Sequence, residues 1–433
     1  MTAFIEREIN RLSDNYQFRT PLSRKQFEIA RKSLPGGNTR NNLYFAPYPP
    51  YFERGEGSKL TDIDGNNYID FLSDFTVAIC GHSNPTLIEE AQKTLSQGMS
   101  YGGCTAAESR LAEAIKDRFN SIEQLRFANS GTEANLYALL TALAYSKKNK
   151  VIVFEGNYHG GMLNFCHPNI PINAPFDTII LPYNDPAAFE TALLEHGDQV
   201  GAVMIELMMN SGGCIPADQE FVDTVRKQTL AHDIPLIVDE VMTARLNYHG
   251  LQEKYQITPD LTSLGKIIGG GFTIGAFGGK EKYMRLYDTQ KSGFTAHGGS
   301  FNNNVLSMNV GAASLSNVLT KDVMVMLNEQ GDNLREQLNK IFYDAEVPLV
   351  FTGGGSVMNL HLAKATPISK NTNPLSAEIC KLYHRFLLNE GIWIAPRGLI
   401  ALSIETTDKG IHILIEKTND FISQYRADLK GLA

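Results

Sequence analysis

Short apolar runs alternate with polar stretches of helical length between about residues 105 and 300. Four of these runs are continuously apolar: 151–154, 178–181, 202–205 and 235–238. Runs of this length fit strands that are buried on both faces of a mainly parallel sheet. The stretches 186–196 and 218–232 have the length and polarity of helices. The alternation predicts an α/β domain with right-handed crossover connections.

The pattern differs on either side of this region. Residues 1–33 are polar and periodic, which predicts one or two helices, and residues 59–70 have the pattern of a hairpin. After about residue 305 a helical stretch extends to about Asp344, and a mixed segment around 353–355 and further helices follow. This second pattern predicts a smaller α+β domain.

A chain of 433 residues has room for two or three domains of ordinary size. We expect an N-terminal helical segment with part of the small domain at 1–60. The large α/β domain is expected at 61–304, and the C-terminal α+β small domain at 305–433.

Composition and charge exclude several classes of partner. The net charge of −8 offers no basic surface for nucleic acid. The N-terminus lacks the apolar core of a signal peptide, and no apolar run approaches the roughly 20 residues that span a bilayer. The sequence therefore predicts no nucleic-acid partner and no membrane association.

The five cysteines are scattered and odd in number, and no two of them have a CxxC spacing. This distribution argues against a disulfide framework and a structural zinc site, and it fits a reducing cytosol. We expect a cytoplasmic protein without a metal site. Cys104 and Cys214 are expected to be buried small hydrophobic residues rather than reactive thiols.

The first motif with chemical potential is Asn129-Ser-Gly-Thr-Glu-Ala-Asn135, which precedes the apolar face of a helix. Ser130, Gly131 and Thr132 would offer two hydroxyls and free backbone N–H groups at the positive end of the helix dipole, which suits a phosphate group. The alternative is a simple N-cap made by Ser130 or Thr132.

The second motif is an apolar strand that ends in Asp239, at the end of the strand where α/β sheets bind their ligands. In a pyridoxal enzyme, an aspartate at this place keeps the pyridine nitrogen protonated. The alternative is an aspartate that caps the next helix. The following carboxylate, Glu240, is expected to face the other way.

The third motif is Lys266, which lies in an apolar stretch before Gly269-Gly-Gly-Phe-Thr-Ile-Gly275. Desolvation there would lower the pKa of the amine and make it a nucleophile for a carbonyl group. The spacing matches neither the phosphate loop of nucleotide-binding enzymes nor the dinucleotide fingerprint. The alternative is a surface lysine beside a flexible loop.

The fourth motif is the glycine-rich turn 156–161, which follows the run 151–154 and contains Tyr158. The aromatic ring of Tyr158 has the shape to lie on a flat heterocycle. The alternative is a turn with an incidentally exposed tyrosine.

Taken together, the four motifs resemble the class III (ω-type) aminotransferases of fold type I. Their order agrees, Lys266 follows Asp239 by 27 residues, and the resemblance extends from about residue 30 to residue 425. It implies an α/β fold of the type I pyridoxal-phosphate-dependent transferases. This fold has a large cofactor-binding domain with a mainly parallel seven-stranded sheet, and a smaller α+β domain. The implied cofactor is pyridoxal 5'-phosphate.

The resemblance also implies a role for each matching residue. Lys266 would carry the cofactor as a Schiff base and move the proton, and Asp239 would pair with the pyridinium nitrogen. Ser300 matches the position from which a partner subunit donates a hydroxyl to the phosphate, so a homodimer with shared active sites is expected. The other implied cofactor contacts are Ser130, Gly131 and Thr132 at the phosphate, Tyr158 and Val241 on the two ring faces, and Glu206 near the rim.

One segment departs from the family pattern. The usual Glu-Pro-x-Gln-Gly is replaced by Glu206-Leu-Met-Met-Asn210. Met209 stands where a glutamine often lies beside the phenolic oxygen of the cofactor. The sequence therefore does not assign the residue that contacts that side of the ring, and Asn210 is a candidate to replace the glutamine.

Two subgroups of the family resemble the chain most. The glutamate-1-semialdehyde 2,1-aminomutases share Pro35-Gly-Gly37 and the stretch 261–271. The β-amino-acid (β-phenylalanine-type) aminotransferases match three details better: 36–40, 299–305 and 388–398. The pattern of the mutases near 298–305 is broken by Asn303 and Val305.

An enzyme that acts on amino acids must hold a carboxylate, and arginine does so with a bidentate fork. The resemblance suggests that Arg40 binds the carboxylate of a β-amino acid and that Arg397 helps with a dicarboxylate co-substrate. For each, the alternative is a structural salt bridge, and Arg245 is a weaker third candidate.

The resulting hypothesis is a pyridoxal-phosphate-dependent aminotransferase. It would move an amino group from a β-amino acid, aromatic ones included, to 2-oxoglutarate or pyruvate. The nearest alternative is the aminomutase. A cofactor-binding protein without catalysis and a nicotinamide dehydrogenase are more distant alternatives, because the first has no support from an attached domain and the second lacks its glycine fingerprint.

Overall fold

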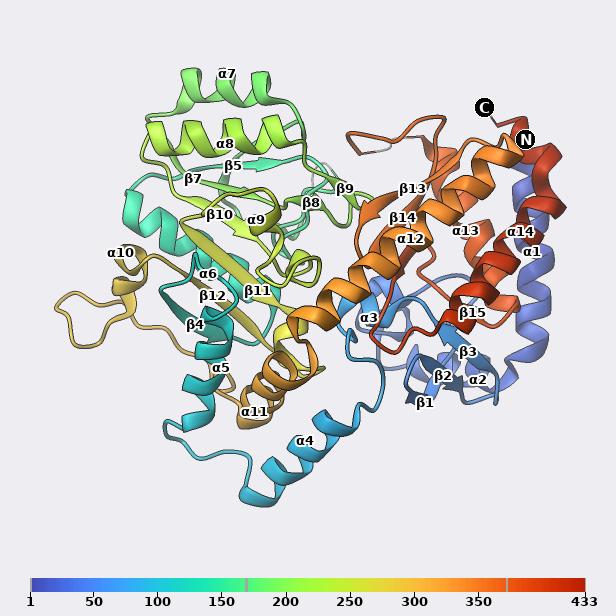
Figure 1. Ribbon diagram of the computed structural model, residues 1–433, viewed down its shortest axis with the longest axis horizontal. Coiled ribbons are helices and arrows are strands. Elements are labelled where there is room, and N and C mark those ends of the chain that lie inside the picture. The colour runs from blue at the N-terminus through green and yellow to red at the C-terminus, as the bar shows by residue number, and fades with distance from the viewer. Residues whose placement is uncertain (1, 168–169, 371–372, 433) are drawn as a thin grey trace. The chain divides into compact units, whose positions relative to one another are not determined.

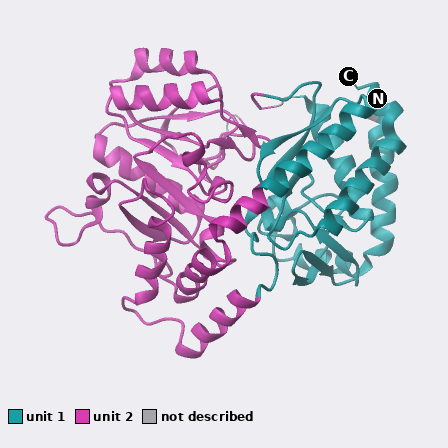
Figure 2. Cartoon of the chain, viewed as in Figure 1, with its two compact units in different colours: residues 1–84, 329–367, 371–433 teal, residues 85–328, 368–370 magenta. Residues whose placement is uncertain are grey.

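The computed structural model describes residues 2–167, 170–370 and 373–432. These residues form two compact units (Figure 2). Unit 1 is built from residues 1–84, 329–367 and 371–433, and unit 2 from residues 85–328 and 368–370. The chain passes from unit 1 to unit 2 between residues 84 and 85, and it returns to unit 1 between residues 328 and 329. The predicted domain boundaries lie instead between residues 60 and 61 and between residues 304 and 305. The three-part division of the chain into domains stays a prediction.

Unit 2 is built around a seven-stranded sheet (Figure 1). Its strands, in spatial order, are β4 (Gln124–Ala128), β12 (Gly275–Gly279), β11 (Leu261–Gly265), β10 (Leu236–Asp239), β7 (Val200–Ile205), β5 (Lys150–Phe154) and β6 (Asp177–Leu181). Only β12 is antiparallel to its neighbours. The predicted α/β class and the mainly parallel seven-stranded sheet are confirmed, and all four apolar runs lie in strands.

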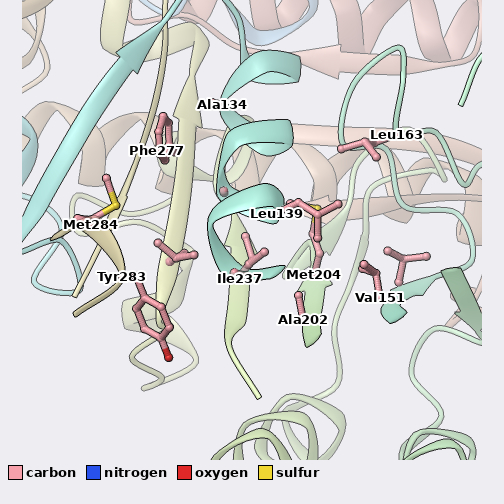
Figure 3. Close-up of a cluster of buried hydrophobic side chains, with 14 of the residues drawn as sticks. Ala134, Leu139, Val151, Leu163, Ala202, Met204, Ile237, Phe277, Tyr283 and Met284 are labelled. Atoms are coloured by element: carbon pink, nitrogen blue, oxygen red, sulfur yellow. The ribbon is translucent and has the colours of Figure 1, made fainter. Parts of the chain in front are cut away.

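Helices cover both faces of this sheet. On one face, α6 (Gly131–Ser146) packs through Ala134 and Leu139 onto a cluster that includes Val151 and Ile237 (Figure 3). Side chains alternate along a strand, so Phe154 of β5 points to the other face. There its ring lies 5.0 Å from the ring of Phe221, on the second of the two helices α7 (Pro186–His196) and α8 (Gln219–Ala231). Both helices were predicted.

Shorter elements complete unit 2. The helices are α4 (Pro85–Gln97), α5 (Ala106–Lys116), η3 (Thr243–Arg245), α9 (Leu251–Lys254), η4 (Lys266–Gly269), α10 (Glu281–Met284), η5 (Arg285–Tyr287), α11 (Val305–Ala313) and the π-helical η6 (Ser314–Val318). The strands β8 (Met208–Met209) and β9 (Ile215–Pro216) form a separate pair.

Unit 1 contains two small sheets. One has the order β1 (Phe52–Glu56), β2 (Lys59–Asp62), β3 (Asn67–Asp70) and β15 (Ile392–Trp393), and it includes the predicted hairpin. The other consists of β13 (Leu349–Gly354), β14 (Val357–Leu362) and β16 (Leu399–Ala401). The helices are α1 (Thr2–Arg19), α2 (Pro21–Ala30), η1 (Pro35–Gly37), η2 (Asn41–Leu43), α3 (Ser73–Thr76), α13 (Pro374–Asn389) and α14 (Asp408–Lys430), together with α12 (Lys321–Ala345), which begins in unit 2.

The cysteines are free, as the sequence predicts, and four of the five are buried. Cys104 is exposed, so the prediction that it is a buried small residue is wrong. It precedes α5 in a loop, and a loop residue lacks the neighbours that would cover it. Within the described ranges, no single helix is both long and apolar enough to cross a membrane.

Candidate active site

The sequence motifs of unit 2 meet at one edge of the seven-stranded sheet. Strands β4, β11, β10, β7 and β5 run in the same direction, and one of the four motifs or, after β7, Glu206 lies at the carboxyl end of each. The residues that follow these ends are Ser130, Lys266, Val241, Glu206 and Tyr158, with Asp239 as the last residue of β10. This edge is where α/β sheets bind their ligands.

The N-terminus of α6 is capped by Ser130. Its Oγ accepts a hydrogen bond of 3.1 Å from the backbone N–H of Glu133, and the Glu133 carboxylate accepts one of 2.9 Å from the N–H of Asn129. The structure therefore shows Ser130 as an N-cap, which was the alternative interpretation of this motif. The cap leaves the N-terminus of α6 at the carboxyl edge of the sheet, where the helix dipole favours an anion.

Three motifs touch directly at this helix end. A Cβ atom at position 131 would lie 2.6 Å from Cγ1 of Val241, so only glycine allows this approach. A Cβ atom at Gly160 would lie 2.3 Å from Oγ1 of Thr132. Gly161 also donates its N–H to the same hydroxyl oxygen, at 3.3 Å. The helix start, the turn of Tyr158 and the end of β10 thus form one site.

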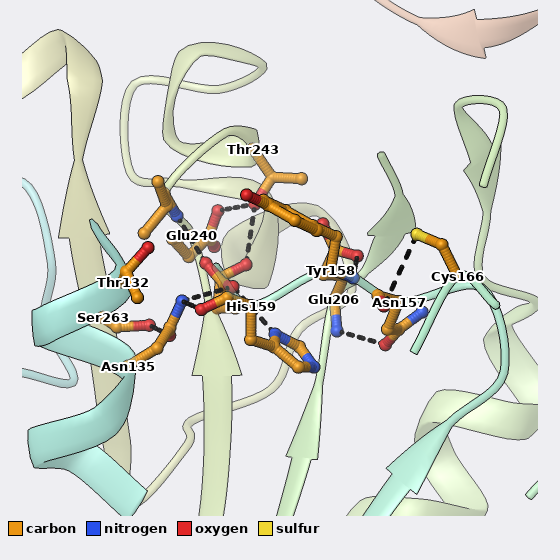
Figure 4. A network of polar contacts seen from close by, with 12 residues as sticks. Thr132, Asn135, Asn157, Tyr158, His159, Cys166, Glu206, Glu240, Thr243 and Ser263 are labelled. Atoms are coloured by element: carbon orange, nitrogen blue, oxygen red, sulfur yellow. Dashed lines mark hydrogen bonds and ion pairs between the residues drawn. The ribbon is translucent and has the colours of Figure 1, made fainter. Parts of the chain in front are cut away.

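Asp239 is 3% exposed and is held by three hydrogen bonds. Its Oδ1 accepts the N–H of Val241 at 2.9 Å. Its Oδ2 lies 2.8 Å from Nδ1 of His159 and 2.8 Å from the amide nitrogen of Asn135 (Figure 4). The Ser263 hydroxyl donates to the amide oxygen of Asn135. Asp239 does not cap the next helix, because the N-cap of η3 is Met242.

Glu240 faces a different set of partners, as predicted. Its carboxylate accepts hydrogen bonds from the Thr243 hydroxyl and, at 2.8 Å, from the N–H of Gln252. Burial raises the pKa of Glu240 to about 7, against the effect of these hydrogen bonds. Glu240 therefore ties the loop after β10 to α9 and is separate from the partners of Asp239.

Glu206 is buried beside Asp239 and Lys266. Its Oε2 accepts the N–H of Tyr158 at 2.9 Å, and its own N–H donates to the side-chain oxygen of Asn157 at 3.0 Å. Burial and the nearby Asp239 raise the pKa of Glu206 well above its usual range, while the Tyr158 hydrogen bond, Lys266 and the backbone of Asn210 oppose that rise. These contacts fix the turn that presents Tyr158, whose side chain is 37% exposed.

Lys266 is half-buried, with φ of 47° in the left-handed region that few residues other than glycine adopt. The next residues, Ile267 and Ile268, are 2% and 0% exposed. The lysine thus emerges from an apolar stretch directly at the end of β11. This environment does not fit the alternative of a surface lysine beside a flexible loop.

The departure from the family pattern has a packing explanation. Met209 is 0% exposed, and its sulfur would lie 2.4 Å from a Cβ atom at Gly156 and 2.0 Å from one at Gly212. The thioether therefore fills apolar space against the backbone of the Tyr158 turn. Asn210 reaches Glu206 through its backbone N–H, so a polar contact persists at this position.

Ser300 and the arginines lie in other surroundings. Ser300 is exposed in the loop before α11. In unit 1, Arg40 forms a 2.7 Å ion pair with Asp74, and Arg397 donates a 3.0 Å hydrogen bond to the side-chain oxygen of Asn359. The salt-bridge alternative is thus observed for Arg40. Arg245 is the last residue of η3 and is 0% exposed, so it is enclosed by protein and does not present its guanidinium at a surface open to a substrate.

The sequence motifs include His159 and Asn135 but assign them no role, and Ser263 was missed altogether. All three are buried and act on Asp239 or on one another. A signal for Asn135 was present, because a polar side chain one turn into a helix, on its apolar face, needs a buried partner. Ser263 gives a similar signal as a hydroxyl inside an apolar strand.

Comparison with known proteins gives consistent matches over most of the chain. The sequence profile of the family described as aminotransferase class-III matches residues 45–418. A β-phenylalanine transaminase of Variovorax paradoxus is 40% identical over 420 residues, which are 96% of this chain and 96% of that protein. A glutamate-1-semialdehyde 2,1-aminomutase of Thermodesulfovibrio yellowstonii is 34% identical over 92% of this chain and 97% of that protein.

Solved structures are similar over the same extent. A β-phenylalanine aminotransferase structure from Variovorax paradoxus has a TM-score of 0.96 and 39% identity, with 98% of each chain covered. A transaminase with pyridoxal phosphate bound has a TM-score of 0.87 and 30% identity, with 95% of this chain and 99% of that chain covered.

Proposed function

The chain belongs to the class III aminotransferases, and from this membership we propose that it moves the amino group of a β-amino acid, aromatic ones included, to 2-oxoglutarate or pyruvate. As a member of this family it is a pyridoxal-phosphate-dependent enzyme with amino acid and keto acid substrates. The single observation that carries the choice of donor is the 40% identity, over 96% of both chains, to a β-phenylalanine transaminase.

The residues at the sheet edge fit pyridoxal 5'-phosphate. The capped N-terminus of α6 has the donors and the dipole for a phosphate. The glycine at 131 lets Val241 approach that end, and the exposed ring of Tyr158 offers a flat surface. Asp239 presents a buried carboxylate to a ring nitrogen, and Lys266 supplies an amine. We assign the phosphate to Ser130, Gly131 and Thr132, the ring faces to Tyr158 and Val241, and the rim to Glu206.

When bound, pyridoxal phosphate supplies a carbonyl carbon that receives the amino group and a ring that takes up the electron pair of the broken C–H bond. Lys266 would hold the cofactor through its amine. With substrate bound, Nζ of Lys266 would act as a general base at the substrate carbon that carries the amino group, where it would take up and later release the proton. Asp239 keeps the ring nitrogen protonated.

Two arginines are proposed for the substrate carboxylates. Arg40 binds the carboxylate of the β-amino acid, and Arg397 helps to bind the dicarboxylate co-substrate. Arginine suits both tasks because its planar fork matches a carboxylate in two hydrogen bonds. In this structure Nη1 of Arg40 is already paired with Asp74, so a substrate carboxylate must compete for it.

We further propose a homodimer in the cytoplasm, in which Ser300 of one chain completes the phosphate site of the other. The exposure of Ser300, and of the neighbouring Phe301 at 65%, supports a surface that a second chain covers.

The function is tested by mixing the yellow holoenzyme with amines in the absence of a keto acid and recording the visible band of the cofactor. The panel contains β-phenylalanine, aliphatic β-amino acids, α-amino acids and glutamate-1-semialdehyde. Loss of the band with β-amino acids, and its recovery with 2-oxoglutarate or pyruvate, is the expected result. Steady formation of 5-aminolevulinate from the semialdehyde, with β-amino acids inert, would establish the aminomutase instead.

A further inference from the structure

Unit 1 contains a cavity whose residues belong to neither the cofactor site nor the proposed carboxylate arginines. Its volume is about 650 Å³, which is within the range of small-molecule sites. It lies between α1, the segment 44–46, residues 378–385 of α13 and Pro396. The wall is largely apolar and aromatic, with Ile5, Ile9, Tyr44, Phe45 and Pro396.

One charged side chain in this wall is buried without a counter-ion among the described residues. Arg385 is 4% exposed, and its guanidinium carbon lies 4.5 Å from the ring centre of Phe45. Its Nη2 donates to the carbonyl oxygen of Ala46. Its other two nitrogens, Nε and Nη1, have no hydrogen-bond acceptor among the residues that the structure describes. A buried cation without a counter-ion costs several kcal/mol, so this site favours an anion.

Among the described residues that line the cavity, no anionic group lies at depth beside Arg385. Burial lowers the pKa of Arg385 to about 10, and burial followed by the neighbouring Arg385 lowers the pKa of His384 well below its usual range. His384 is 1% exposed, and its Nε2 is also unpartnered among the described residues. The carboxylate of Glu378 forms a 2.7 Å ion pair with Lys381. Glu6 and Lys381 are exposed, so both belong to the rim.

We propose that this cavity binds a small arylalkanoate, with the carboxylate at the guanidinium of Arg385 and the aryl group among Ile5, Tyr44 and Phe45. The buried cation selects an anion, and the apolar walls select an anion with an apolar body over a hydrated one such as phosphate. In the described lining of the cavity no acidic group lies at depth to receive an ammonium, so the ligand lacks an amino group near its carboxylate. Nε and Nη1 of Arg385 are themselves buried, so side chains of the wall must move to admit the carboxylate, and Tyr44, at 43%, is the most exposed aromatic residue of that wall.

The chain contains an intrinsic fluorophore close to this cavity. Trp393 is the only tryptophan, and its ring centre lies 6.1 Å from that of Phe45 and 5.9 Å from that of His384. The experiment titrates the holoenzyme with 3-phenylpropanoate, which has the carboxylate and the phenyl group but cannot be transaminated, and follows the emission of Trp393. We expect a saturable change whose affinity falls about tenfold or more in Arg385→Gln.

Two controls separate the cavity from other sites. Lys381→Gln removes an exposed cation of the rim, and it should leave the titration unchanged. The double variant Arg40→Gln/Arg397→Gln should also leave it unchanged, because the proposed substrate arginines take no part. A titration that survives Arg385→Gln, or that is lost with Arg40 and Arg397, overturns the proposal. An equal response to inorganic phosphate contradicts the assignment of an aryl group.

A second measurement does not depend on the folding of any variant. Crystals of the holoenzyme soaked in 3-(4-bromophenyl)propanoate should give an anomalous bromine signal between Ile5 and Phe45. A signal elsewhere, without one in the cavity, rejects the proposal. This test does not depend on which amino acid donates the amino group. The proposal for the cavity and the proposed function can therefore fail independently of each other.

Discussion

Asp239 is held in one orientation by a chain of side chains that begins at Ser263. The Ser263 hydroxyl fixes the amide of Asn135, and that amide donates to Oδ2 of Asp239 together with His159. A hydrogen bond to a charged group contributes about 1.5–3 kcal/mol. The carboxylate that we propose for the ring nitrogen of the cofactor is therefore positioned by buried side chains from β11, α6 and the turn 156–161.

Asn135→Ala tests this positioning. Loss of its hydrogen bond should leave Asp239 less well oriented and should lower kcat with β-phenylalanine about tenfold, with a smaller effect on KM. Thr141→Val is the matched control, because Thr141 lies on the same helix and bonds to Tyr287 instead. Equal effects of the two substitutions on kcat would show that both act by destabilising α6. Asn135 would then not be needed to orient Asp239.

Asp74→Asn tests the competition at Arg40. Asp74 lies on α3, where all four residues have positive φ, and its carboxylate pairs with Arg40 at 2.7 Å. Removal of this charge should lower KM for β-amino acids about threefold, because a partly exposed ion pair of this kind contributes up to about 1 kcal/mol. KM for 1-phenylethylamine, which has no carboxylate, should stay the same. An equal change of KM for both donors would argue against a carboxylate role for Arg40.

At the scale of elements, the apolar runs predicted β5, β7 and β10 because these strands are buried on both faces. The run 178–181 predicted β6 as well, but β6 is the edge strand and its residues are exposed or half-buried, so the expectation of burial on both faces is wrong there. The apolar runs did not reveal β12, whose sequence Gly-Ala-Phe-Gly-Gly has the composition of a loop. The reason is tertiary, since a Cβ atom at Gly275 would lie 2.0 Å from the carbonyl oxygen of Ser130. A close approach between distant segments leaves no signature in local periodicity.

For a similar reason, the sequence predicted only part of the candidate site. Backbone-defined positions, such as Ser130 at a helix start and Asp239 at a strand end, follow from the alternation of strands and helices. The support of Asp239 by His159 and Asn135 depends on how α6 and the turn 156–161 pack over β10. That packing is set by side chains 80 and 104 residues away from Asp239 along the chain.

Gly131→Ala should weaken cofactor binding by crowding Val241. The new methyl group would lie 2.6 Å from Cγ1 of Val241, so either the helix start or the valine must move. We expect the Kd of pyridoxal phosphate to rise about tenfold, and Val241→Ala in the same chain to restore much of the loss. The measurement is an absorbance titration of the apoenzyme. Failure of the double variant to recover affinity would mean that Gly131 is needed for its backbone alone.

Glu240 makes the joint between β10 and α9 sensitive to pH. Its pKa of about 7 in the folded chain exceeds the ordinary value of 4.5. Between these values the unfolded chain loses the proton and the folded chain keeps it. The free energy of unfolding therefore falls as pH rises, by on the order of 3 kcal/mol in total.

Glu240→Gln should remove this decline. We expect its melting temperature to match that of the native chain near about pH 5 and to exceed it by a few degrees near about pH 8. Glu253→Gln, an exposed substitution on α9, is the control. A constant difference across the range would show that Glu240 ionises in the folded protein as it does in water.

At the scale of the whole molecule, the proposed shared active site predicts complementation between two defective chains. Lys266→Ala should abolish turnover, and Ser300→Ala should weaken the cofactor's phosphate contact. In a mixed dimer, one site would combine the native Lys266 of one chain with the native Ser300 of the other. Unfolding and refolding the two variants together should thus restore native cofactor affinity in that site. No recovery would place Ser300 in the site of its own chain, or outside it.

Unit 1 is assembled from both ends of the chain, with residues 85–328 of unit 2 inserted between them. Strand β3 pairs in parallel with β15, and the partners Ile69 and Ile392 are 323 residues apart. At ribosomal rates of about 5–20 residues per second, β3 is synthesised roughly 15–65 s before β15. Unit 2 emerges complete before then. Cotranslational folding should therefore begin in the middle of the chain, and the exposed edge of β3 is the segment that a nascent-chain chaperone would have to protect.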